Sequence, residues 1–201
     1  MTRIVSGRAR GRRLAVPPGD VRPTTSRTRE AVFSSLEHRI GDWPAVAVLD
    51  LFAGSGAMGL EAASRGAGSV LLVERDPRVH RVLRRNADLV GAEGVGVCRA
   101  DAYRLGPRGS RCRPAAPADL VILDPPYRDE ASAVAGLLID LDRWGWLAPG
   151  ALAVVERSSH DATFAWPGGW VSLADRRYAD TNVSFGMLVA SAPSPAEPDR
   201  P

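Results

Sequence analysis

From residue 46 onwards, short apolar runs alternate with stretches of helical periodicity, and this alternation limits the possible folds more than any other feature. The apolar runs have strand length and lie at residues 46–49, 70–73, 95–98, 120–123, 152–155, 170–173 and 185–190. Apolar residues at helical spacing fill the gaps at residues 58–63, 79–90 and 134–141. Strands that alternate with helices form parallel sheets through right-handed crossovers, so we expect a doubly wound α/β fold. The last two runs have no helix between them, which predicts a terminal hairpin with an antiparallel final strand.

The N-terminal part of the chain has a different pattern. Residues 3–6 and 12–16 resemble two short strands around an Arg/Gly turn, which predicts a β-hairpin. A helix is expected after Thr25, which can cap it, because apolar residues recur at helical spacing between 32 and 40. The sequence therefore predicts a hairpin and helix extension at 1–44, an α/β domain at 45–190 and a disordered Pro-rich tail at 191–201.

Charge is unevenly distributed along the chain, which has arginine as its only strongly basic residue type. Residues 1–29 hold eight arginines and one acid, Asp20, whereas the remainder holds 18 arginines and 22 acids. A basic arm on a mildly acidic body predicts a polyanionic partner, and the planar guanidinium group suits phosphate. We expect the following arm residues to contact nucleic acid: Arg3, Arg8, Arg10, Arg12, Arg13, Arg22, Thr24, Arg27 and Arg29. The arginines between 78 and 85 are more typical of the solvent face of an amphipathic helix.

Composition argues against several other classes of protein. No apolar run approaches the roughly 20 residues of a membrane span, and the first residues lack the apolar core of a secretory signal. Cys98 and Cys112 form no CxxC pair and indicate no disulfide framework, which favours a reducing cytoplasm. The three histidines show no metal-ligand spacing, so no metal is expected. We predict a cytoplasmic monomer without a membrane or metal partner.

A glycine-rich loop follows the first apolar run of the α/β region. Gly54, Gly56 and Gly59 match G-x-G-x-x-G between a strand and a helix, which is the context that this motif requires. Glu74 lies at the end of the second strand, where a carboxylate can accept hydrogen bonds from both ribose hydroxyls of a nucleoside. These features alone fit a nicotinamide cofactor as well as other nucleosides.

Three further features favour S-adenosylmethionine. Asp50 stands four residues before the first glycine of the loop, Asp101 follows the third strand where it can bind an adenine amino group, and the fourth strand ends in Asp124-Pro125-Pro126-Tyr127. Together they resemble the class I S-adenosylmethionine-dependent methyltransferases, a Rossmann-like fold whose seven-stranded, mostly parallel sheet has an antiparallel last strand. The resemblance implies that S-adenosylmethionine is the cofactor and is bound by Asp50, Gly54, Gly56, Glu74, Asp101 and Ala102.

The Asp124–Tyr127 segment predicts methylation of an exocyclic amine. Such an amine is a poor nucleophile, because its lone pair is delocalised into the ring, and its two N–H groups need acceptors before it can attack. The Asp124 carboxylate and the Pro125 carbonyl can accept them, and Pro126 helps to hold the backbone rigid. Tyr127 offers a flat face for stacking the base. Catalysis is expected to come from positioning and desolvation rather than from a strong general base.

The N-terminal motifs resemble those of one family. RIVSG at 3–7, RGRRL at 10–14 and RPTT at 22–25, followed by REAVF at 29–33, look like the N-terminal signature of the RsmD family, and the resemblance extends to about residue 189. Its members methylate the N2 amine of one guanine in 16S rRNA, within the 30S subunit or a late assembly intermediate, and the resemblance implies the same here. Ala179 departs from the family, which usually has glycine at that position.

Other functions remain as alternatives. The nearest are an N6-adenine DNA methyltransferase and another amine methyltransferase with an Asp-Pro-Pro-Tyr site, including enzymes that act on glutamine. Glutamine enzymes normally carry Asn where this chain has Asp124, and DNA enzymes usually have a separate target-recognition segment. A nicotinamide oxidoreductase would need an acid or base at the hydride site, for which the sequence offers no suitable histidine or Ser/Tyr-x-x-x-Lys motif.

Overall fold

The computed structural model describes residues 2–17, 25–106, 112–178 and 180–189, and every structural statement below concerns these residues. The predictions made for Arg22, Thr24, Ala179 and the tail at 191–201 lie outside them. The strands are β1 (Thr2–Arg3), β2 (Arg13–Leu14), β3 (Ala47–Asp50), β4 (Ser69–Val73), β5 (Val95–Cys98), β6 (Ala118–Leu123), β7 (Leu147–Ser158), β8 (Trp170–Tyr178) and β9 (Thr181–Leu188). The helices are α1 (Ser26–Glu37), α2 (Ala57–Arg65), α3 (Pro77–Val90) and α4 (Ala131–Arg143), with short 3-10 turns η1 (Trp43–Ala45) and η2 (Ala102–Arg104). None of the described helices is long and apolar enough to cross a membrane.

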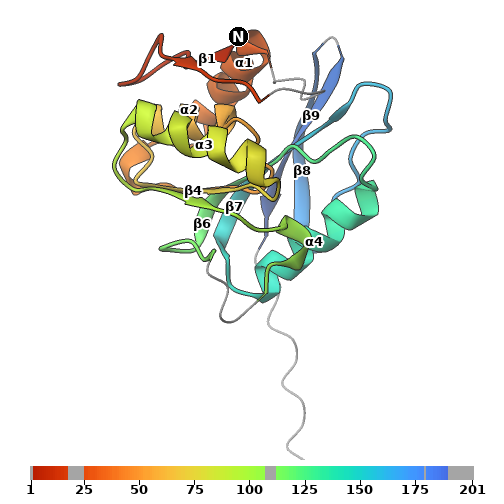
Figure 1. Cartoon of the computed structure of the whole chain (residues 1–201). Helices are drawn as coiled ribbons and strands as arrows, with labels where there is room; N and C mark the ends of the chain where they lie inside the picture. The colour runs from red at the N-terminus through yellow and green to blue at the C-terminus, as the bar shows by residue number, and fades with distance from the viewer. Residues whose placement is uncertain (1, 18–24, 107–111, 179, 190–201) are drawn as a thin grey trace, which may run out of the picture.

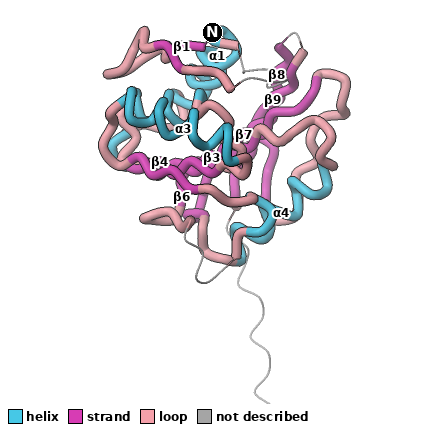
Figure 2. The backbone as a smooth tube through the Cα atoms, viewed as in Figure 1, coloured by secondary structure: helices cyan, strands magenta, loops and turns pink. Residues whose placement is uncertain are grey.

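Seven strands form one sheet in the order β5-β4-β3-β6-β7-β9-β8 (Figures 1 and 2). The pairs from β5 to β7 are all parallel, whereas β9 lies antiparallel between β7 and β8. The predicted mostly parallel sheet, its terminal hairpin and its antiparallel last strand are thus confirmed. The chain returns to the other side of β3 when it enters β6, so the strand order reverses between these two strands.

Both faces of the sheet are covered. Successive residues of its central strands point to opposite sides, so the strands contribute to a core on each face. Val48, Leu120 and Ile122 belong to one apolar core, which also contains the buried apolar residues of α1 and α2. Leu49 and Val121 belong to a second core, on the face that α4 covers (Figure 1). The central strands therefore consist almost entirely of apolar residues rather than of alternating apolar and polar ones.

The N-terminal arm, which we define as residues 2–17, is attached to α2. The Glu61 carboxylate accepts the backbone N–H groups of Val5 at 2.8 Å and Ser6 at 2.9 Å. Gly7 has a φ of +78°, and a Cβ there would lie 1.8 Å from the Ser64 carbonyl oxygen, so only glycine fits this close approach. The predicted strands at 3–6 and 12–16 are consequently shorter than expected, because the N–H groups of residues 5 and 6 bond to α2.

The structure corrects the prediction that Arg29 contacts nucleic acid. The Arg29 side chain is fully buried and lies 3.5 Å from the Glu61 carboxylate, which is buried as well. Its guanidinium also donates to the Thr2 hydroxyl at 3.1 Å. Burial lowers the pKa of Arg29, while the neighbouring Glu61 opposes that shift. Arg29 thus joins α1, the arm and α2, and its guanidinium cannot reach a phosphate without unpacking them.

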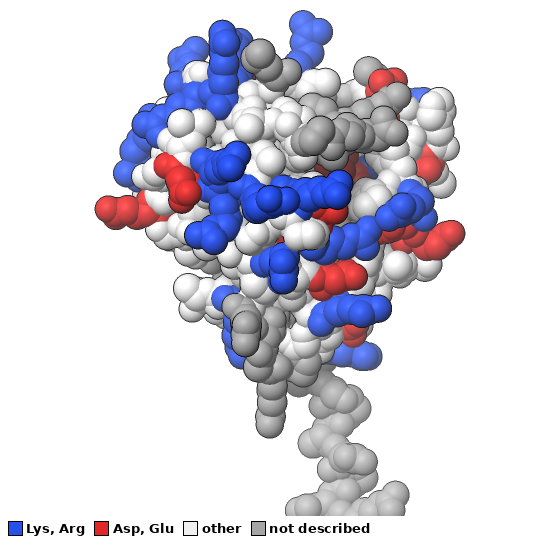
Figure 3. Space-filling view, in the orientation of Figure 1, with Lys and Arg blue, Asp and Glu red and all other residues white. Residues whose placement is uncertain are grey.

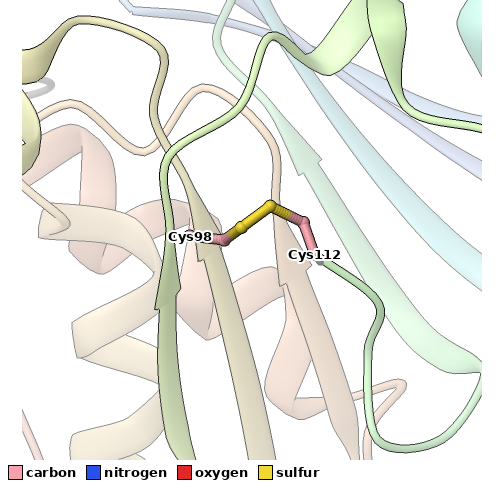
Figure 4. Close-up of a disulfide and its surroundings, with 2 residues drawn as sticks. All are labelled: Cys98 and Cys112. Carbon is pink, nitrogen blue, oxygen red and sulfur yellow. A yellow bond between two sulfur atoms is a disulfide. The ribbon is translucent and has the colours of Figure 1, made fainter. Parts of the chain in front are cut away.

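The structure also corrects the prediction that the two cysteines indicate no disulfide. Cys98, at the end of β5, and Cys112 form a disulfide, with Cα atoms 5.6 Å apart (Figure 4). The sequence analysis found no sign of a disulfide, because a single pair separated by 14 residues has no characteristic spacing. The bond links the two ends of a segment that carries Asp101 and Ala102.

Candidate active site

A cavity of about 830 Å³ opens at the carboxyl ends of the parallel strands, where the strand order reverses between β3 and β6. Ligands of open α/β sheets bind at such a position. Its walls come from the glycine loop, the ends of β4, β5 and β6, the segment after β7 and the β8–β9 turn. The predicted residues in its lining are Asp50, Gly54, Glu74, Asp101, Ala102 and Asp124–Tyr127.

The glycine loop fits tightly between β3 and α2. Gly56 is the N-cap of α2 and has a φ of +84°, a conformation that L side chains rarely adopt. A Cβ on Gly56 would lie 2.5 Å from a side-chain methyl of Leu83 on α3. Gly56 is not part of the cavity lining, so its role is to let the loop turn beneath α3 and leave the rest of the loop facing the cavity.

Asp50 lies at the bottom of the cavity and supports the glycine loop. Its side chain is only 2% exposed, and one carboxylate oxygen accepts the backbone N–H of Gly59 at 2.9 Å, in the first turn of α2. Burial raises the pKa of Asp50 to about 7, and the nearby negative charge of Glu74 acts in the same direction. A carboxylate at a helix N-terminus is electrostatically favourable, which partly offsets this cost of burial.

Glu74 and Asp101 are oriented by backbone amides at the ends of their strands. Glu74 accepts N–H groups from Gly54 at 3.0 Å and from Asp76 at 2.7 Å. Asp101 accepts the N–H of Tyr103 at 3.1 Å and lies 3.9 Å from the guanidinium of Arg75. Carboxylate oxygens have further lone pairs, so both groups can still accept hydrogen bonds from a ligand in the cavity.

The other half of the cavity is built on the Asp124–Tyr127 segment. Asp124 follows β6 directly and lines the cavity together with Pro125, Pro126 and Tyr127. Pro125 is buried, whereas the Tyr127 ring is 43% exposed at the cavity mouth. An exposed aromatic ring beside a carboxylate can hold a flat, hydrogen-bonding group such as a nucleobase.

Arg157, at the end of β7, fastens this half of the cavity from behind. Its guanidinium is nearly buried and donates to the Asp129 carbonyl at 2.7 Å and to the Asp161 carboxylate at 3.1 Å. Asp129 also acts on Tyr103: burial, and then the neighbouring Asp129 carboxylate, raise the pKa of the Tyr103 hydroxyl. One buried arginine therefore connects the loop after Tyr127 to the segment after β7.

Outside the glycine loop, the cavity lining contains four polar residues that the sequence did not predict as site residues: Arg75, Ser158, His160 and Asp180. Arg75 follows Glu74 directly, and Asp180 lies in the YADT segment at 178–181, which resembles a segment of the family. No local motif marks Ser158 and His160, at the end of β7 and after it. The position of β7 beside β6 in the sheet brings the segment after β7 to the cavity. The position of Asp180 depends on how β9 inserts between β7 and β8.

The arm and the first turn of α1 present their other arginines to solvent. Arg3, Arg8, Arg10, Arg12, Arg13 and Arg27 lie outside the buried core. Arg12 donates to the carbonyls of Leu89 and Val90, the latter at 2.9 Å, and so attaches the arm to the end of α3. Figure 3 shows arginine side chains over the arm and over α3 on the same face of the molecule. The arginines of α3 are exposed, as expected for its solvent face.

Comparison with known proteins identifies the family. The family described as Conserved hypothetical protein 95 matches residues 2–187. The chain belongs to this family. It is 39% identical over 175 residues to the ribosomal RNA small subunit methyltransferase D of Escherichia coli K12, covering 84% of this chain and 80% of that protein. The resemblance to the RsmD family is thus confirmed.

Solved structures of similar proteins share the fold. The Escherichia coli protein yhhF superimposes with a TM-score of 0.78 and 34% identity, covering 94% of this chain and 99% of that one. A Thermus thermophilus protein, TTHA0928, gives a TM-score of 0.75 and 31% identity, covering 92% and 98%. The class I methyltransferase fold is therefore established for this RsmD family member, although the role of each cavity residue remains a prediction.

Proposed function

We propose that this protein transfers a methyl group from S-adenosylmethionine to the exocyclic N2 amine of a guanine in 16S rRNA. It acts as a monomer on the 30S subunit or on a late assembly intermediate. The proposed location is the cytoplasm, because that substrate is there; the cysteines, which form a disulfide, do not support it. The observation that carries the proposal is the continuity of one cavity from Gly54 and Glu74 to Asp124 and Tyr127. The nucleoside-binding half, around Gly54 and Glu74, and the amine-binding half, around Asp124 and Tyr127, must share one space if a methyl group is to pass between them.

The residues of the first half fit S-adenosylmethionine. Glu74 would accept the ribose hydroxyls, Asp101 the adenine amino group, and the backbone around Gly54 would face the amino-acid part. The cavity volume of about 830 Å³ lies within the usual range for small-molecule sites. When bound, the cofactor supplies a methyl group on a positively charged sulfur that leaves as a neutral thioether.

The residues of the second half would position the amine. Asp124 would accept one N–H of the guanine N2 amine and the Pro125 carbonyl the other, so that the nitrogen lone pair points at the methyl carbon. Tyr127 would stack on the base and help to exclude water. On methylation the nitrogen would become acidic and would pass one proton to the Asp124 carboxylate and from there to solvent, so no strong base is required. Most of the rate enhancement would come from this positioning.

The exposed arginines of the arm supply affinity for the rRNA. Unlike Arg29, they face solvent, and several lie on the face that also carries the arginines of α3. Each phosphate contact contributes to affinity through counterion release, independently of sequence. The similarity of this chain to the ribosomal RNA small subunit methyltransferase D of Escherichia coli supports rRNA as the polyanionic partner.

The decisive experiment measures which nucleoside acquires the methyl group. The protein is incubated with labelled S-adenosylmethionine and 30S particles that lack the modification, naked 16S rRNA or duplex DNA. We expect N2-methylguanosine in digests of the 30S particles, and no transfer by D124A, which should still bind S-adenosylmethionine. Label found only in DNA, or as N6-methyladenosine, would contradict the proposal.

A further inference from the structure

Asp180 and Asp124 line the same cavity and come from the ends of different strands. Asp124 directly follows β6, and Asp180 directly precedes β9, with β7 between these strands in the sheet. The last residue of β7, Ser158, pairs with Thr181 at the start of β9. Because β9 is antiparallel to β7, its beginning meets the carboxyl ends of β7 and its parallel neighbour β6, and both aspartates line one cavity.

The backbone around Asp180 is anchored. Its carbonyl accepts the N–H of Ser159 at 3.0 Å, and the neighbouring Asn182 amide donates to the Ser158 carbonyl at 3.4 Å. Arg157, through Asp161, holds the same segment against the loop after Tyr127. These contacts are made by the backbone of residue 180 and by its neighbours.

Two carboxylates in this half of the cavity match guanine better than any other base. The edge of guanine presents the N2 amine and the N1–H group next to each other, and both are hydrogen-bond donors. At the corresponding ring position adenine and cytosine carry an acceptor, which a carboxylate would repel. If the Asp124 carboxylate and the Pro125 carbonyl hold the two N–H groups of the amine, the N1–H still needs an acceptor, and Asp180 lines the cavity from an exposed position at its edge.

We propose that the Asp180 carboxylate accepts the N1–H of the target guanine and thereby selects guanine over other amino-substituted bases. The inference rests on the proposed guanine-N2 methylation and assigns the group that makes the site specific. A hydrogen bond to a charged acceptor contributes enough that its loss should lower kcat/KM by about 10- to 100-fold. A site built to receive a donor also rejects analogues that lack it, because its acceptor is then left without a partner.

The experiment compares three bases at the methylated position of 30S particles assembled in vitro. Guanine has the N1–H, whereas 2-aminoadenine and 2-aminopurine keep the reactive 2-amino group but have an unprotonated N1. The two analogues differ from each other at position 6, so an effect that they share is located at N1. We measure kcat/KM for the wild-type protein and for D180A, D180N and D175N. Asp175 lies on β8 in the same hairpin and is absent from the cavity lining, so D175N is a matched change of charge.

We expect the wild-type protein to prefer guanine strongly over both analogues. D180A should lose about 10- to 100-fold on guanine and little on either analogue, so that the preference collapses, and D180N should lie between. D175N should keep the wild-type preference. Equal losses on all three bases would indicate a structural role, and an unchanged preference would indicate that Asp124 binds N1–H itself; either result overturns the proposal. If the wild-type protein fails to methylate guanine at N2, the proposed function fails instead.

Discussion

The side chains of Arg29 and Glu61 form an ion pair 3.5 Å apart, and neither exposes any surface to solvent. Glu61 also receives the N–H groups of Val5 and Ser6 and the Nε of Arg65 at 3.0 Å. One carboxylate on α2 therefore organises the arm, α1 and its own helix. The arm is consequently part of the folded body, and its exposed arginines are held on a rigid support.

Removing the Glu61 charge should destabilise the fold strongly. E61Q removes the larger of the two carboxylate charges that act on the buried Arg29 guanidinium, those of Glu61 and Glu156, and loss of one partner from a buried pair typically costs about 3–5 kcal/mol. E37Q is the control, because Glu37 pairs with Arg65 while about half exposed, and such pairs contribute at most about 1 kcal/mol. Denaturant unfolding gives both values. Equally small losses of unfolding free energy in E61Q and E37Q would show that another group compensates the charge of Arg29.

Exchanging exposed arm arginines should weaken RNA binding without affecting the cofactor site. R8Q/R10Q/R13Q removes three charges from solvent-exposed positions, and the slope of log K against log salt should fall by about 2–3. The control R113Q/R143Q removes exposed charges near the amino ends of β6 and β7. Filter binding of 16S rRNA and calorimetry with S-adenosylmethionine measure the two effects. A salt slope equal to that of the wild-type protein would exclude these residues from the RNA contact.

Arg157 should position the amine-binding half without contacting the cofactor. R157K keeps the charge but cannot donate at once to the Asp129 carbonyl and the Asp161 carboxylate, because lysine lacks the planar fork. We expect kcat to fall by roughly tenfold, while the Kd for S-adenosylmethionine changes little. Single-turnover methylation and calorimetry separate the two quantities. A parallel loss of cofactor affinity would point to a general loss of structure instead.

Asp50 should make stability decrease as the pH rises towards neutrality. Burial raises its pKa from an ordinary value of 3.8 to about 7, so the folded protein keeps a proton that the unfolded chain has released between these values. Its stabilising contribution is therefore complete below about pH 4 and is lost as the pH rises through 7. D50N has no titrating group there and can still accept the Gly59 N–H.

Urea unfolding across this range tests the sign of the effect. Relative to the wild-type protein, the unfolding free energy of D50N should rise by more than about 1 kcal/mol between about pH 5 and pH 8. A difference that stays constant with pH would mean that Asp50 titrates near its ordinary value.

The Cys98–Cys112 bond should stabilise the segment that carries Asp101 and Ala102. Denatured, unreduced protein should show no reactive thiol, and C112S should lower the unfolding free energy by about 3 kcal/mol, the value expected for closing a loop of about this length. Reduction should also weaken binding of S-adenosylmethionine. The C98S/C112S protein is the control, since a reductant should not alter it. Two reactive thiols in protein purified without reductant would show that the pair is reduced in the cell.

Much of the fold could be predicted because its signals are local. The apolar runs at 46–49 and 120–123 are long enough for strands buried on both faces, and Gly54 and Gly56 mark the strand-to-helix turn between β3 and α2. Asp124–Tyr127 stands out because its chemistry is contained in four consecutive residues. Each of these signals depends on neighbours in the sequence, so no knowledge of distant contacts was needed.

The sequence by itself determined the sheet, the glycine loop and the Asp-Pro-Pro-Tyr segment, whereas only the tertiary structure decided which charges face a ligand. Arg29 and Arg8 look alike in the sequence, yet one is buried against Glu61 and the other is exposed. Asp180 reaches the cavity only through the pairing of β9 with β7. The physical reason is that burial and strand register arise from contacts between residues far apart in the chain, which local periodicity does not encode.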